Sequence, residues 1–368
     1  MMIDKNIDKF FMNEVLMLAA KGKYTTQPNP MVGAIIVKNN KIVSTGYHKK
    51  PGTLHAEQVA IRKAGVKAKN STLYINLEPC CHYGRTPPCS DLIIDSKISR
   101  VVISSLDPNP LVNGKSVKQL KKNGVIVNIG ILKKESIALN KRFFSKFIHK
   151  RPYVTAKFGM SLDGKISLSN GVSKWITSID SRRDVQRERA SHSLIFTSSA
   201  TVLKDNPQMT IRDSILIKKI IKQPDIAILD RNLKIPVNSK VFQDKSRLVY
   251  IFTSRKQASK KYRSNVVLVK TPLVNKKINI KDCLKYLAQQ DINDIFLESG
   301  SNLMNSFLKE KLIDELLLYI SPKILGQDAV SFSGIKDIEK LSKKIQYTIS
   351  DMIVINNDLK VKLENYNV

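Results

Sequence analysis

The feature that most constrains this chain is a set of metal-ligand residues spread over three short segments. His55-Ala56-Glu57 is followed by Pro79-Cys80 and, later still, by Cys89. One imidazole and two thiolates complete three corners of the tetrahedron that zinc prefers, and the fourth corner then stays open for water. A fold that uses these residues together must bring positions 55, 80 and 89 to one point.

Glu57 lies two residues from His55, close enough to act on water at such a centre. Zinc lowers the pKa of water bound to it to about 7. In nucleobase deamination a glutamate that is not a ligand takes a proton from this water and passes protons to the ring and the departing amine. We therefore expect His55, Cys80 and Cys89 to hold Zn²⁺, Glu57 to be catalytic, and the chain to be a zinc-dependent deaminase.

The four cysteines leave one choice of ligand open. Cys80 and Cys81 are adjacent, so either thiol could bind, although the Pro-Cys order of the deaminase signature favours Cys80. We expect Cys81 and Cys283 to be small buried hydrophobic residues. Three cysteines within ten residues suit a metal site in a reducing compartment, so we predict no disulfide. A purely structural zinc site would need a fourth protein ligand, for which Cys81 or His82 are the available residues.

The hydrophobic pattern predicts alternating helices and strands in the first half. Helices are expected at 8–21, from His55 to Ala64, after Pro88, at 115–123 and over 133–150, with strands at 32–38, 41–46, 71–77, 100–104 and 125–130. Such alternation is typical of a layered α/β domain. We place the domain boundary near residue 150, which gives domains of 1–149 and 150–368.

The second half also reads as α/β. Strands are expected at 153–158, 193–197, 225–229, 248–253, 266–270, 294–297 and 315–320. The three-glycine dinucleotide fingerprint is absent, and Glu298-Ser299-Gly300-Ser301-Asn302 stands instead between a predicted strand and a predicted helix. A glycine there would let backbone amides at a helix start approach a phosphate.

The high positive charge of the chain does not by itself indicate a nucleic-acid partner. The net charge is +31 over 368 residues, which ordinarily suggests a nucleic-acid or anionic-surface partner. Residues 1–149 carry 24 basic and 9 acidic side chains and residues 150–368 carry 38 and 22, so neither half is a dedicated basic arm. We expect no nucleic-acid partner. Without a run of roughly 20 apolar residues or a signal peptide, we also expect no membrane span and a cytoplasmic protein.

Spacing distinguishes among the deaminases. Nucleic-acid editors have two residues between their cysteines, whereas eight separate Cys80 from Cys89. The insert 81–88, together with 27–33 (QPNPMVG) and 107–114 (DPNPLVNG), closely resembles the bifunctional deaminase/reductase family of riboflavin biosynthesis. The resemblance continues through 161–165 (SLDGK), 175–178 (WITS) and 197–207 (TSSATVLKDNP), and it covers nearly the whole chain.

The resemblance implies a cytidine-deaminase-like three-layer domain followed by a dihydrofolate-reductase-like domain. It also implies that 2,5-diamino-6-(5-phosphoribosylamino)pyrimidin-4(3H)-one is deaminated by zinc-dependent hydrolysis and that NADPH then reduces the ribosyl side chain to give 5-amino-6-(5-phosphoribitylamino)uracil. Members form oligomers, so we expect a homo-oligomer.

Matching to the family assigns further site residues. Those expected to contact NADPH are Gly159, Trp175, Thr201, Asp205, Gly300, Ser301, Asn302, Leu303, Met304, Asn305 and Ser306. Those expected to contact the reductase substrate are Ser173, Arg189, Met209, Arg212 and Glu298, with Lys157 as a further candidate to orient or protonate the opened sugar. Those expected near the deaminase substrate are Asn29, His82, Asp107 and Asn109. Arg231 falls where the family usually has a serine that contacts the cofactor.

Some of these assignments have a simple structural alternative. A guanidinium can bind a phosphate through two parallel hydrogen bonds, which suits Arg189 and Arg212 to a ribose phosphate, but 182–189 also reads as an exposed basic helix face. Trp175, the only tryptophan, could simply pack in the core. The remaining functional alternative is a nucleic-acid-modifying zinc deaminase with a separate binding domain, whose affinity for RNA would fall steeply with salt.

Overall fold

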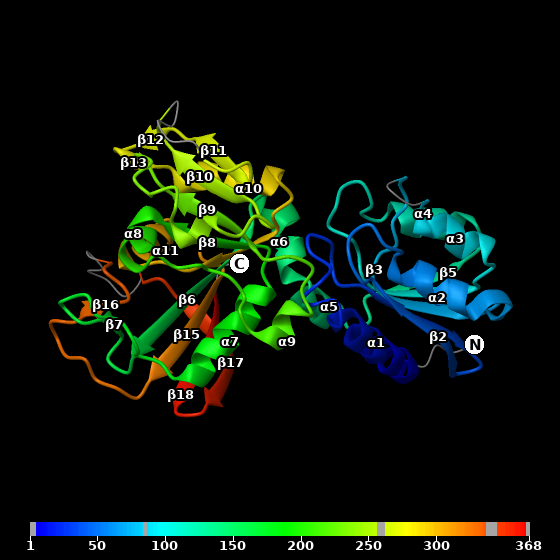
Figure 1. Ribbon diagram of the computed structural model, residues 1–368. Coiled ribbons are helices and arrows are strands. Elements are labelled where there is room, and N and C mark those ends of the chain that lie inside the picture. Colours follow the sequence, from blue (N-terminus) through cyan, green and yellow to red (C-terminus); the bar gives the residue numbers. More distant parts are fainter. Residues whose placement is uncertain (1–4, 84–86, 256–261, 336–343, 366–368) are drawn as a thin grey trace. The chain divides into compact units, whose positions relative to one another are not determined.

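The computed structural model describes residues 5–83, 87–255, 262–335 and 344–365 (Figure 1). The chain separates into two compact units, Met1–Lys150 and Arg151–Val368, and each unit has its own sheet. No described helix is long and apolar enough to cross a membrane.

Unit 1 is built on one mixed sheet. Its helices are α1 (Lys5–Ala20), α2 (Ala56–Ala64), α3 (Cys89–Asp95), α4 (Lys115–Lys122), α5 (Lys133–Leu139) and α6 (Lys141–His149), with a short 3₁₀ turn at Gly65–Ala68. Its strands are β1 (Gly33–Lys38), β2 (Lys41–Tyr47), β3 (Thr72–Leu77), β4 (Arg100–Ser105) and β5 (Ile126–Ile129). The strand order is β2-β1-β3-β4-β5, with β1 antiparallel to both neighbours and β3, β4 and β5 parallel.

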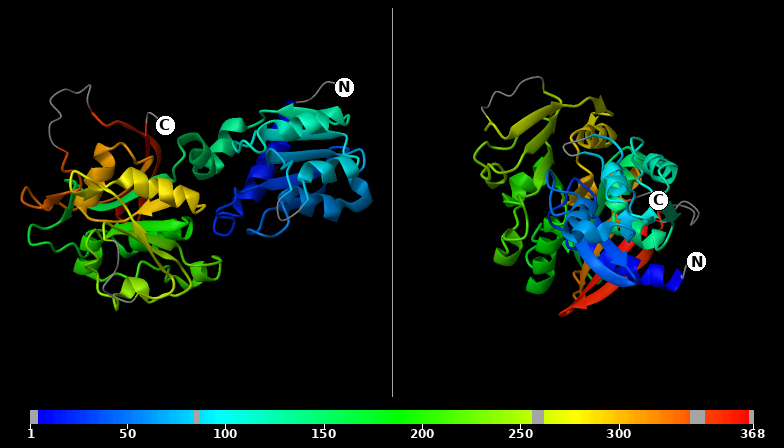
Figure 2. Two further views of the ribbon diagram at one scale, coloured as in Figure 1. Left: turned by 90° about the horizontal axis from the view of Figure 1, so that it is seen from above. Right: turned by 90° about the vertical axis from the view of Figure 1, so that its right-hand side faces the viewer.

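Alternating side chains of these strands build two cores. In β1, Ala34 and Ile36 pack with residues of α2, α3 and α4, whereas Ile35 and Val37 pack with residues of α1 on the opposite face. Successive side chains of a strand point to opposite faces, so apolar runs such as 34–37 are buried on both sides. The result is three layers, helix, sheet and helix, which Figure 2 shows from two further sides.

Two details of unit 1 differ from expectation. The helix expected over 133–150 is two helices, because Asn140 ends α5 and begins α6. The Asn140 side chain instead holds the backbone of Met31, accepting from its N–H (2.8 Å) and donating to its carbonyl (2.9 Å). His55 is the residue before the first turn of α2, and not within that turn.

Unit 2 contains a larger sheet. Its helices are α7 (Ile179–Ala190), α8 (Ser199–Asp205), α9 (Ser214–Ile217), α10 (Ile280–Gln289) and α11 (Ser301–Lys309), with a 3₁₀ turn at Lys240–Phe242. The large-sheet strands are β6 (Tyr153–Ser161), β8 (Leu194–Ser198), β9 (Asp225–Leu229), β10 (Val249–Thr253), β11 (Val266–Lys270), β14 (Asp294–Leu297), β15 (Glu315–Ser321), β17 (Tyr347–Ile355) and β18 (Asp358–Asn365). Two small ribbons pair β7 (Lys165–Ser167) with β16 (Val330–Ser331) and β12 (Leu273–Val274) with β13 (Lys277–Ile278).

The order of the large sheet is β11-β10-β9-β8-β14-β6-β15-β18-β17. The strands from β11 to β15 are parallel, and the hairpin of β17 and β18 adds an antiparallel edge. Residues of α10 and α11 cover one face in the main core, and α8 contributes to a smaller core on the opposite face of β8, β9 and β10. The hairpin has no counterpart among the expected strands. Strand β17 is exposed along most of its length and lacks a buried apolar alternation, whereas β18 alternates Leu359, Val361 and Leu363 with polar residues and could have been predicted.

A buried ionic network attaches α7 to this hairpin. The ammonium of Lys360 on β18 contacts Asp184 and, at 2.9 Å, Glu188, both on α7. Tyr319 of β15 donates a hydrogen bond to Asp184 (2.7 Å). Burial favours the neutral form of Glu188, but the charge of Lys360 prevails and lowers the pKa of Glu188 to about 2. The network fixes the helix that carries Arg189.

Close packing of β2 on α2 generates a first prediction. A Cβ atom at Gly46 would lie 2.3 Å from the carbonyl oxygen of Ala56 and 2.8 Å from the nitrogen of Ala60. Gly46→Ala should therefore push α2 away from the sheet and lower the free energy of unfolding by about 1–3 kcal/mol, the usual range for overpacking. Chemical denaturation of the variant, with Thr45→Ser on the same strand as control, measures this. An unfolding midpoint equal to that of the wild type would contradict the prediction.

Candidate functional site

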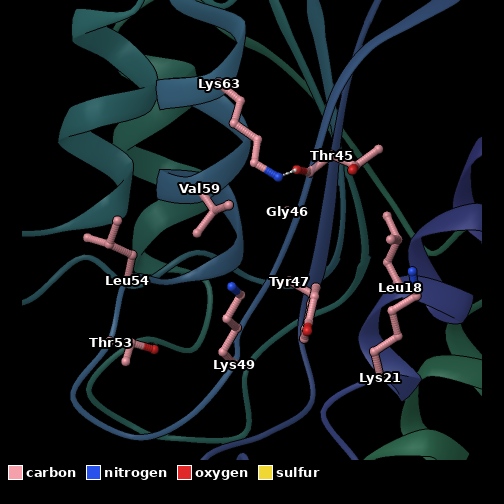
Figure 3. A pocket seen from close by; sticks show the side chains of 10 residues that line it. All are labelled: Leu18, Lys21, Thr45, Gly46, Tyr47, Lys49, Thr53, Leu54, Val59 and Lys63. Atoms are coloured by element: carbon pink, nitrogen blue, oxygen red, sulfur yellow. Dashed lines mark hydrogen bonds between the residues drawn. The ribbon is translucent and has the colours of Figure 1, made fainter.

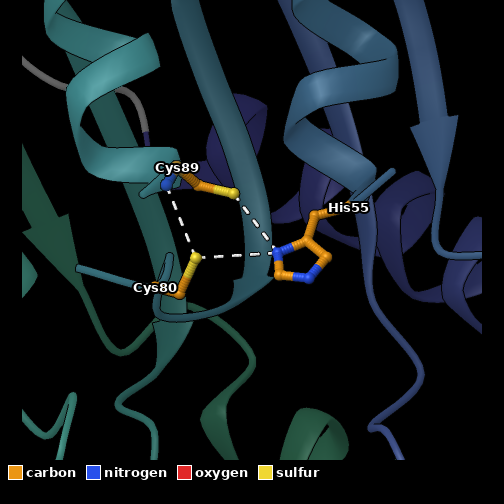
Figure 4. A group of neighbouring side chains, drawn as sticks. All are labelled: His55, Cys80 and Cys89. Carbon is orange, nitrogen blue, oxygen red and sulfur yellow. Dashed lines mark hydrogen bonds between the residues drawn. The ribbon is translucent and has the colours of Figure 1, made fainter. Parts of the chain in front are cut away.

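Three donor atoms of unit 1 come together at the ends of secondary-structure elements (Figure 4). His55 precedes α2, Cys80 follows β3, and Cys89 is the first residue of α3. The Nδ1 atom of His55 lies 3.6 Å from the Sγ atom of Cys80 and 3.3 Å from that of Cys89, and all three donor atoms lie within 4.8 Å of one another. The pieces that the sequence separates by up to 34 positions thus form one cluster.

The cluster has the dimensions of a zinc site. Zinc–sulfur bonds of about 2.3 Å and zinc–nitrogen bonds of about 2.0–2.1 Å place tetrahedral N and S ligands about 3.5 Å apart. The two N···S distances in the cluster bracket this value. Among the described residues, the cluster brings together no fourth His, Cys, Asp or Glu donor.

Hydrogen bonds among the three side chains shift their pKa values. A hydrogen bond to Cys80 raises the pKa of His55 to about 9. Hydrogen bonding from Cys89 is the main cause that lowers the pKa of Cys80 to about 4, and His55 adds to it. Cys80 is therefore a thiolate at neutral pH, the form that binds metal. The hydrogen bond to Cys80 raises the pKa of Cys89, and burial raises it further.

Glu57 is buried beside this cluster, only 3% exposed. Burial raises the pKa of its carboxyl group. Its Oε2 atom has no hydrogen-bond partner among the described residues. Buried polar atoms are nearly always satisfied, so an unsatisfied carboxyl oxygen in this position is a sign of function.

The loop that carries Asn29 reaches the cluster through a histidine that the sequence analysis missed. Asn29 Nδ2 lies 3.0 Å from His48 Nε2, and His48 Nδ1 lies 3.2 Å from the carbonyl oxygen of Leu54. The His48 ring packs edge-on against the ring of His55, with 5.5 Å between centroids. His48 stands outside any recognisable motif, and its only sequence signal is its position between a predicted strand and His55.

A second missed residue, Glu78, organises the loop of Asp107 and Asn109. Its carboxylate accepts hydrogen bonds from Ser116 Oγ (2.8 Å), the Gly114 N–H (2.9 Å) and the Asp107 N–H (3.3 Å). Burial raises the pKa of Asp107 to about 7, while its carboxylate accepts from the Asn109 N–H at 2.8 Å. Glu78 directly precedes Pro79-Cys80, and that position was its only signal.

The insert between the two cysteines is more open. Cys81 is partly exposed, and its Sγ atom donates to the Leu111 carbonyl at 3.7 Å, so the expectation of a buried Cys81 was wrong. Cys283 is fully buried, as expected. His82 is exposed. Gly84, Arg85 and Thr86 lie outside the described residues.

Unit 1 also has a hollow with a volume of about 390 Å³ (Figure 3). It is lined by Leu18, Lys21, Thr45, Gly46, Tyr47, Lys49, Thr53, Leu54, Val59 and Lys63. The Lys63 ammonium donates to the Thr45 carbonyl at 3.2 Å. None of the expected site residues lines the hollow, although Leu54, which directly precedes His55, does.

A buried ion pair marks the site of unit 2. The Arg189 guanidinium donates to both carboxylate oxygens of Glu298, at 2.5 and 2.9 Å, and Lys157 Nζ lies 3.5 Å from Glu298 Oε2. Burial would favour neutral Glu298, but the charges of Arg189 and Lys157 prevail and lower its pKa to about 2. Arg189, with 14% of its side chain exposed, is therefore not part of an exposed basic face.

Two helix starts lie together next to this pair. Helix α8 begins directly after β8 and α11 begins after β14, and these two strands are parallel neighbours. The Gly300 N–H donates to Thr201 Oγ1 at 3.4 Å, which joins two of the expected cofactor residues. Residues 301–306 form the first turns of α11, and Asp205 ends α8. Helix N-termini beside a glycine form a positive site suited to phosphate.

The remaining expected residues of unit 2 lie on or near exposed segments. The indole of Trp175 is 63% exposed, with the Arg182 guanidinium 4.0 Å from its centroid, so Trp175 does not pack in the core. Ser173 is exposed on the same segment, which is held to α8 by a hydrogen bond from Lys204 to the Gly171 carbonyl (2.8 Å).

Gly159 lies on β6, where a Cβ atom would meet Thr177 at 3.5 Å. Met209 is buried and Arg212 is exposed, both in a segment without helix or strand. Arg231 follows β9 and donates to the Lys276 carbonyl at 2.5 Å.

Known proteins match both units. Residues 5–105 match the model of the cytidine and deoxycytidylate deaminase zinc-binding region, and residues 152–358 match the model of the RibD C-terminal domain. The riboflavin biosynthesis protein RibD of Buchnera aphidicola is 42% identical over 98% of this chain and 99% of its own length. Acinetobacter baumannii RibD, a solved structure, is 35% identical, with a TM-score of 0.90 over 98% of this chain and 99% of its own.

A third match is the deaminase/reductase of Thermotoga maritima, a solved structure that is 33% identical, with a TM-score of 0.86 over 98% of this chain and 99% of its own. These matches confirm the expected fold class, a cytidine-deaminase-like domain and a dihydrofolate-reductase-like domain. They also confirm Zn²⁺ and NADPH as cofactors. The chain therefore belongs to the RibD family of bifunctional riboflavin biosynthesis proteins, which combine a pyrimidine deaminase with a reductase.

Proposed function

We propose that residues 1–149 deaminate 2,5-diamino-6-(5-phosphoribosylamino)pyrimidin-4(3H)-one and that residues 150–368 reduce the deaminated product with NADPH to 5-amino-6-(5-phosphoribitylamino)uracil. The Thermotoga maritima protein carries the name of both activities, a diaminohydroxyphosphoribosylaminopyrimidine deaminase and a 5-amino-6-(5-phosphoribosylamino)uracil reductase. The observation that carries the proposal is the meeting of His55, Cys80 and Cys89 beside a buried glutamate.

In the first site, His55, Cys80 and Cys89 hold the zinc ion. Bound zinc supplies Lewis acidity, which makes water nucleophilic near neutral pH. Glu57 takes the proton of the attacking water and delivers protons to the ring nitrogen and the leaving amine. Asn29, Asp107 and Asn109 orient the pyrimidine. Their loops are held close to the cluster by hydrogen bonds with His48 and Glu78. His82 is exposed and is the candidate for a further contact.

In the second site, the first turns of α11 and residues Thr201 and Asp205 of α8 bind the cofactor phosphates and ribose. Gly159 and Trp175 complete this contact from β6 and the segment after β7. Ser173, Arg189, Met209, Arg212 and Glu298 bind the substrate, with Arg212 as the exposed cation for its phosphate. When bound, NADPH supplies the hydride.

The ionised state of Glu298 separates its role from that of Lys157. A carboxyl group with a pKa of about 2 is ionised at neutral pH, so Glu298 accepts hydrogen bonds and does not donate a proton. Lys157 carries transferable protons and lies 3.5 Å from Glu298. We assign to Lys157 the protonation of the opened sugar and to Glu298 the positioning of Lys157 and Arg189.

A nucleic-acid-modifying deaminase with an unrelated binding domain is not favoured, because the second unit matches the RibD C-terminal domain along nearly its whole length. The substrate is a small molecule, and we propose that the protein acts in the cytoplasm without a nucleic-acid or membrane partner.

Homo-oligomer formation is proposed through the edge of the large sheet. Strand β17 lies at the end of that sheet, is exposed along most of its length, and has Asp351 as its only charged residue. Ile349, Met352 and Val354 on this strand are 61%, 58% and 74% exposed. An apolar edge strand of nine residues is a ready template for pairing with a second copy.

Glu57→Gln tests the first site. The variant should release ammonia from the diaminopyrimidine phosphate at least about a hundredfold more slowly, because proton transfer typically contributes 10²–10⁴-fold. It should retain zinc, measured by elemental analysis, and it should still oxidise NADPH when given the deaminated substrate. Glu135→Gln, an exposed glutamate of α5, is the control. Loss of zinc from Glu57→Gln would show that Glu57 is a ligand.

Lys157→Met tests the second site. Oxidation of NADPH on the deaminated substrate should fall by about a hundredfold if Lys157 supplies the proton. Ammonia release should not change, because the deaminase residues lie in the other unit. Lys285→Met, which removes an exposed ammonium from α10, should behave as the wild type. An unchanged rate of NADPH oxidation by Lys157→Met would show that another group donates the proton.

Val354→Lys tests the oligomer. Placing a charge on the exposed edge should prevent a second copy from pairing, and sedimentation velocity should then show a smaller species than for the wild type. Val66→Lys, at a residue 93% exposed in unit 1, is the control. A wild-type chain that sediments as a monomer, or a Val354→Lys variant that associates like the wild type, would contradict this role of β17.

A further inference from the structure

Arg247 is one of the largest fully buried side chains of the protein, only 1% exposed. Among the described residues, no carboxylate oxygen lies within salt-bridge distance of its guanidinium. Burial lowers its pKa, to about 10, against the opposing effect of the Asp244 and Asp225 carboxylates, so the guanidinium is still charged at neutral pH. Burying a charge without a direct ion pair is costly unless hydrogen bonds compensate.

Backbone carbonyls provide that compensation. The guanidinium donates to the carbonyl oxygens of Gln208 and Met209, both at 2.6 Å, and to that of Val241 at 3.2 Å. Hydrogen bonds from a charged donor are short and about twice as strong as neutral ones. Two of the three acceptors are consecutive residues of 206–213, a segment with neither helix nor strand. Arg247 therefore holds a loop.

The conformation of this loop needs to be held. Met209 has a φ of 50°, in the left-handed region that side chains other than glycine rarely adopt. Such a conformation persists only when its surroundings over-determine it. The two hydrogen bonds from Arg247 act on the two peptide groups that flank Met209 and supply this constraint.

The next three residues are fastened in the same way. The Arg189 guanidinium donates to the Thr210 carbonyl at 3.4 Å. The Gln223 side chain accepts from the Ile211 N–H (2.7 Å) and donates to its carbonyl (3.0 Å), and Gln186 accepts from the Arg212 N–H at 2.9 Å. Five consecutive residues, 208–212, thus each have a backbone group bound by a side chain from elsewhere in the unit.

We propose that Arg247 is a positioning residue for the reductase substrate. Arg247 fixes the Gln208 and Met209 carbonyls and, with them, the backbone that carries Met209 and Arg212. Arg189 connects the same backbone to Glu298. In a planar trans peptide the N–H points opposite to the preceding C=O, so the Met209 and Thr210 N–H groups point away from Arg247. The phosphoribosyl group of the substrate is the anion that this arranged loop suits. This inference rests on the proposed function of unit 2.

Arg247→Met removes all three hydrogen bonds, and Arg247→Lys keeps a charge that can reach some of the carbonyls. Arg247→Met should raise the KM for the deaminated substrate at least about tenfold, since small misplacements in a binding site are costly, and leave the Kd for NADPH within about twofold. The KM of Arg247→Lys should lie between those of the wild type and Arg247→Met. Gln223→Leu, which releases Ile211, should raise the same KM. Arg263→Met is the control, because Arg263 is exposed and donates to the Gln243 carbonyl outside the loop.

Three outcomes would overturn the inference. One is a wild-type KM in folded Arg247→Lys and Gln223→Leu variants, which remain informative where Arg247→Met does not fold. Another is a KM in Arg247→Lys no better than in a folded Arg247→Met. The last is a variant in which NADPH binding weakens, the KM rises and the melting temperature falls together. That result would show that Arg247 only stabilises the core. A wild-type protein that reduces nothing would instead refute the proposed function, and amide hydrogen exchange at 208–212 would then still show whether Arg247→Lys releases the loop.

Discussion

Everything in the first unit converges on the placement of one nitrogen and two sulfur atoms from three separate elements. Neither a histidine before a helix nor a cysteine after a strand is reactive alone. Their meeting within 4.8 Å creates a site of zinc dimensions, and the buried Glu57 beside it has a carboxyl oxygen without a partner among the described residues. The close contact of β2 with α2, the His48 contact and the Glu78 hydrogen bonds all fix the surroundings of these three atoms.

In the second unit, the site forms where the ends of parallel strands lie side by side. In parallel sheets, ligands bind beyond the carboxyl ends of the strands. Here β8 and β14 end side by side, and each leads into a helix, so that Thr201 and Gly300 are hydrogen-bonded. The same edge holds Glu298 between Arg189 and Lys157. Each buried charge in this arrangement is stabilised by the others, so removing one of them would leave a buried charge without its partner.

Sequence patterns predicted most of the strands, since buried parallel strands are short apolar runs bounded by turns. They failed where tertiary contacts decide. Asn140 divides a helical pattern because its side chain binds the Met31 backbone, and the exposed strand β17 has no buried apolar alternation to detect. Strand β18 was missed although Leu359, Val361 and Leu363 alternate with polar residues. The metal cluster was predictable because zinc demands particular residue types. His48, Glu78 and Arg247 were not, because their roles depend on backbone groups distant in sequence.

The central claim is that zinc is held by one histidine and two cysteines, with Cys81 uninvolved. X-ray absorption at the zinc edge of the purified wild-type protein, repeated on Cys81→Ala, measures the ligand set directly. The account predicts two sulfur atoms at about 2.3 Å and lighter atoms at about 2.0–2.1 Å, with identical spectra for both proteins. A third sulfur in the wild type that disappears in Cys81→Ala would contradict it and would make the site a closed, structural one.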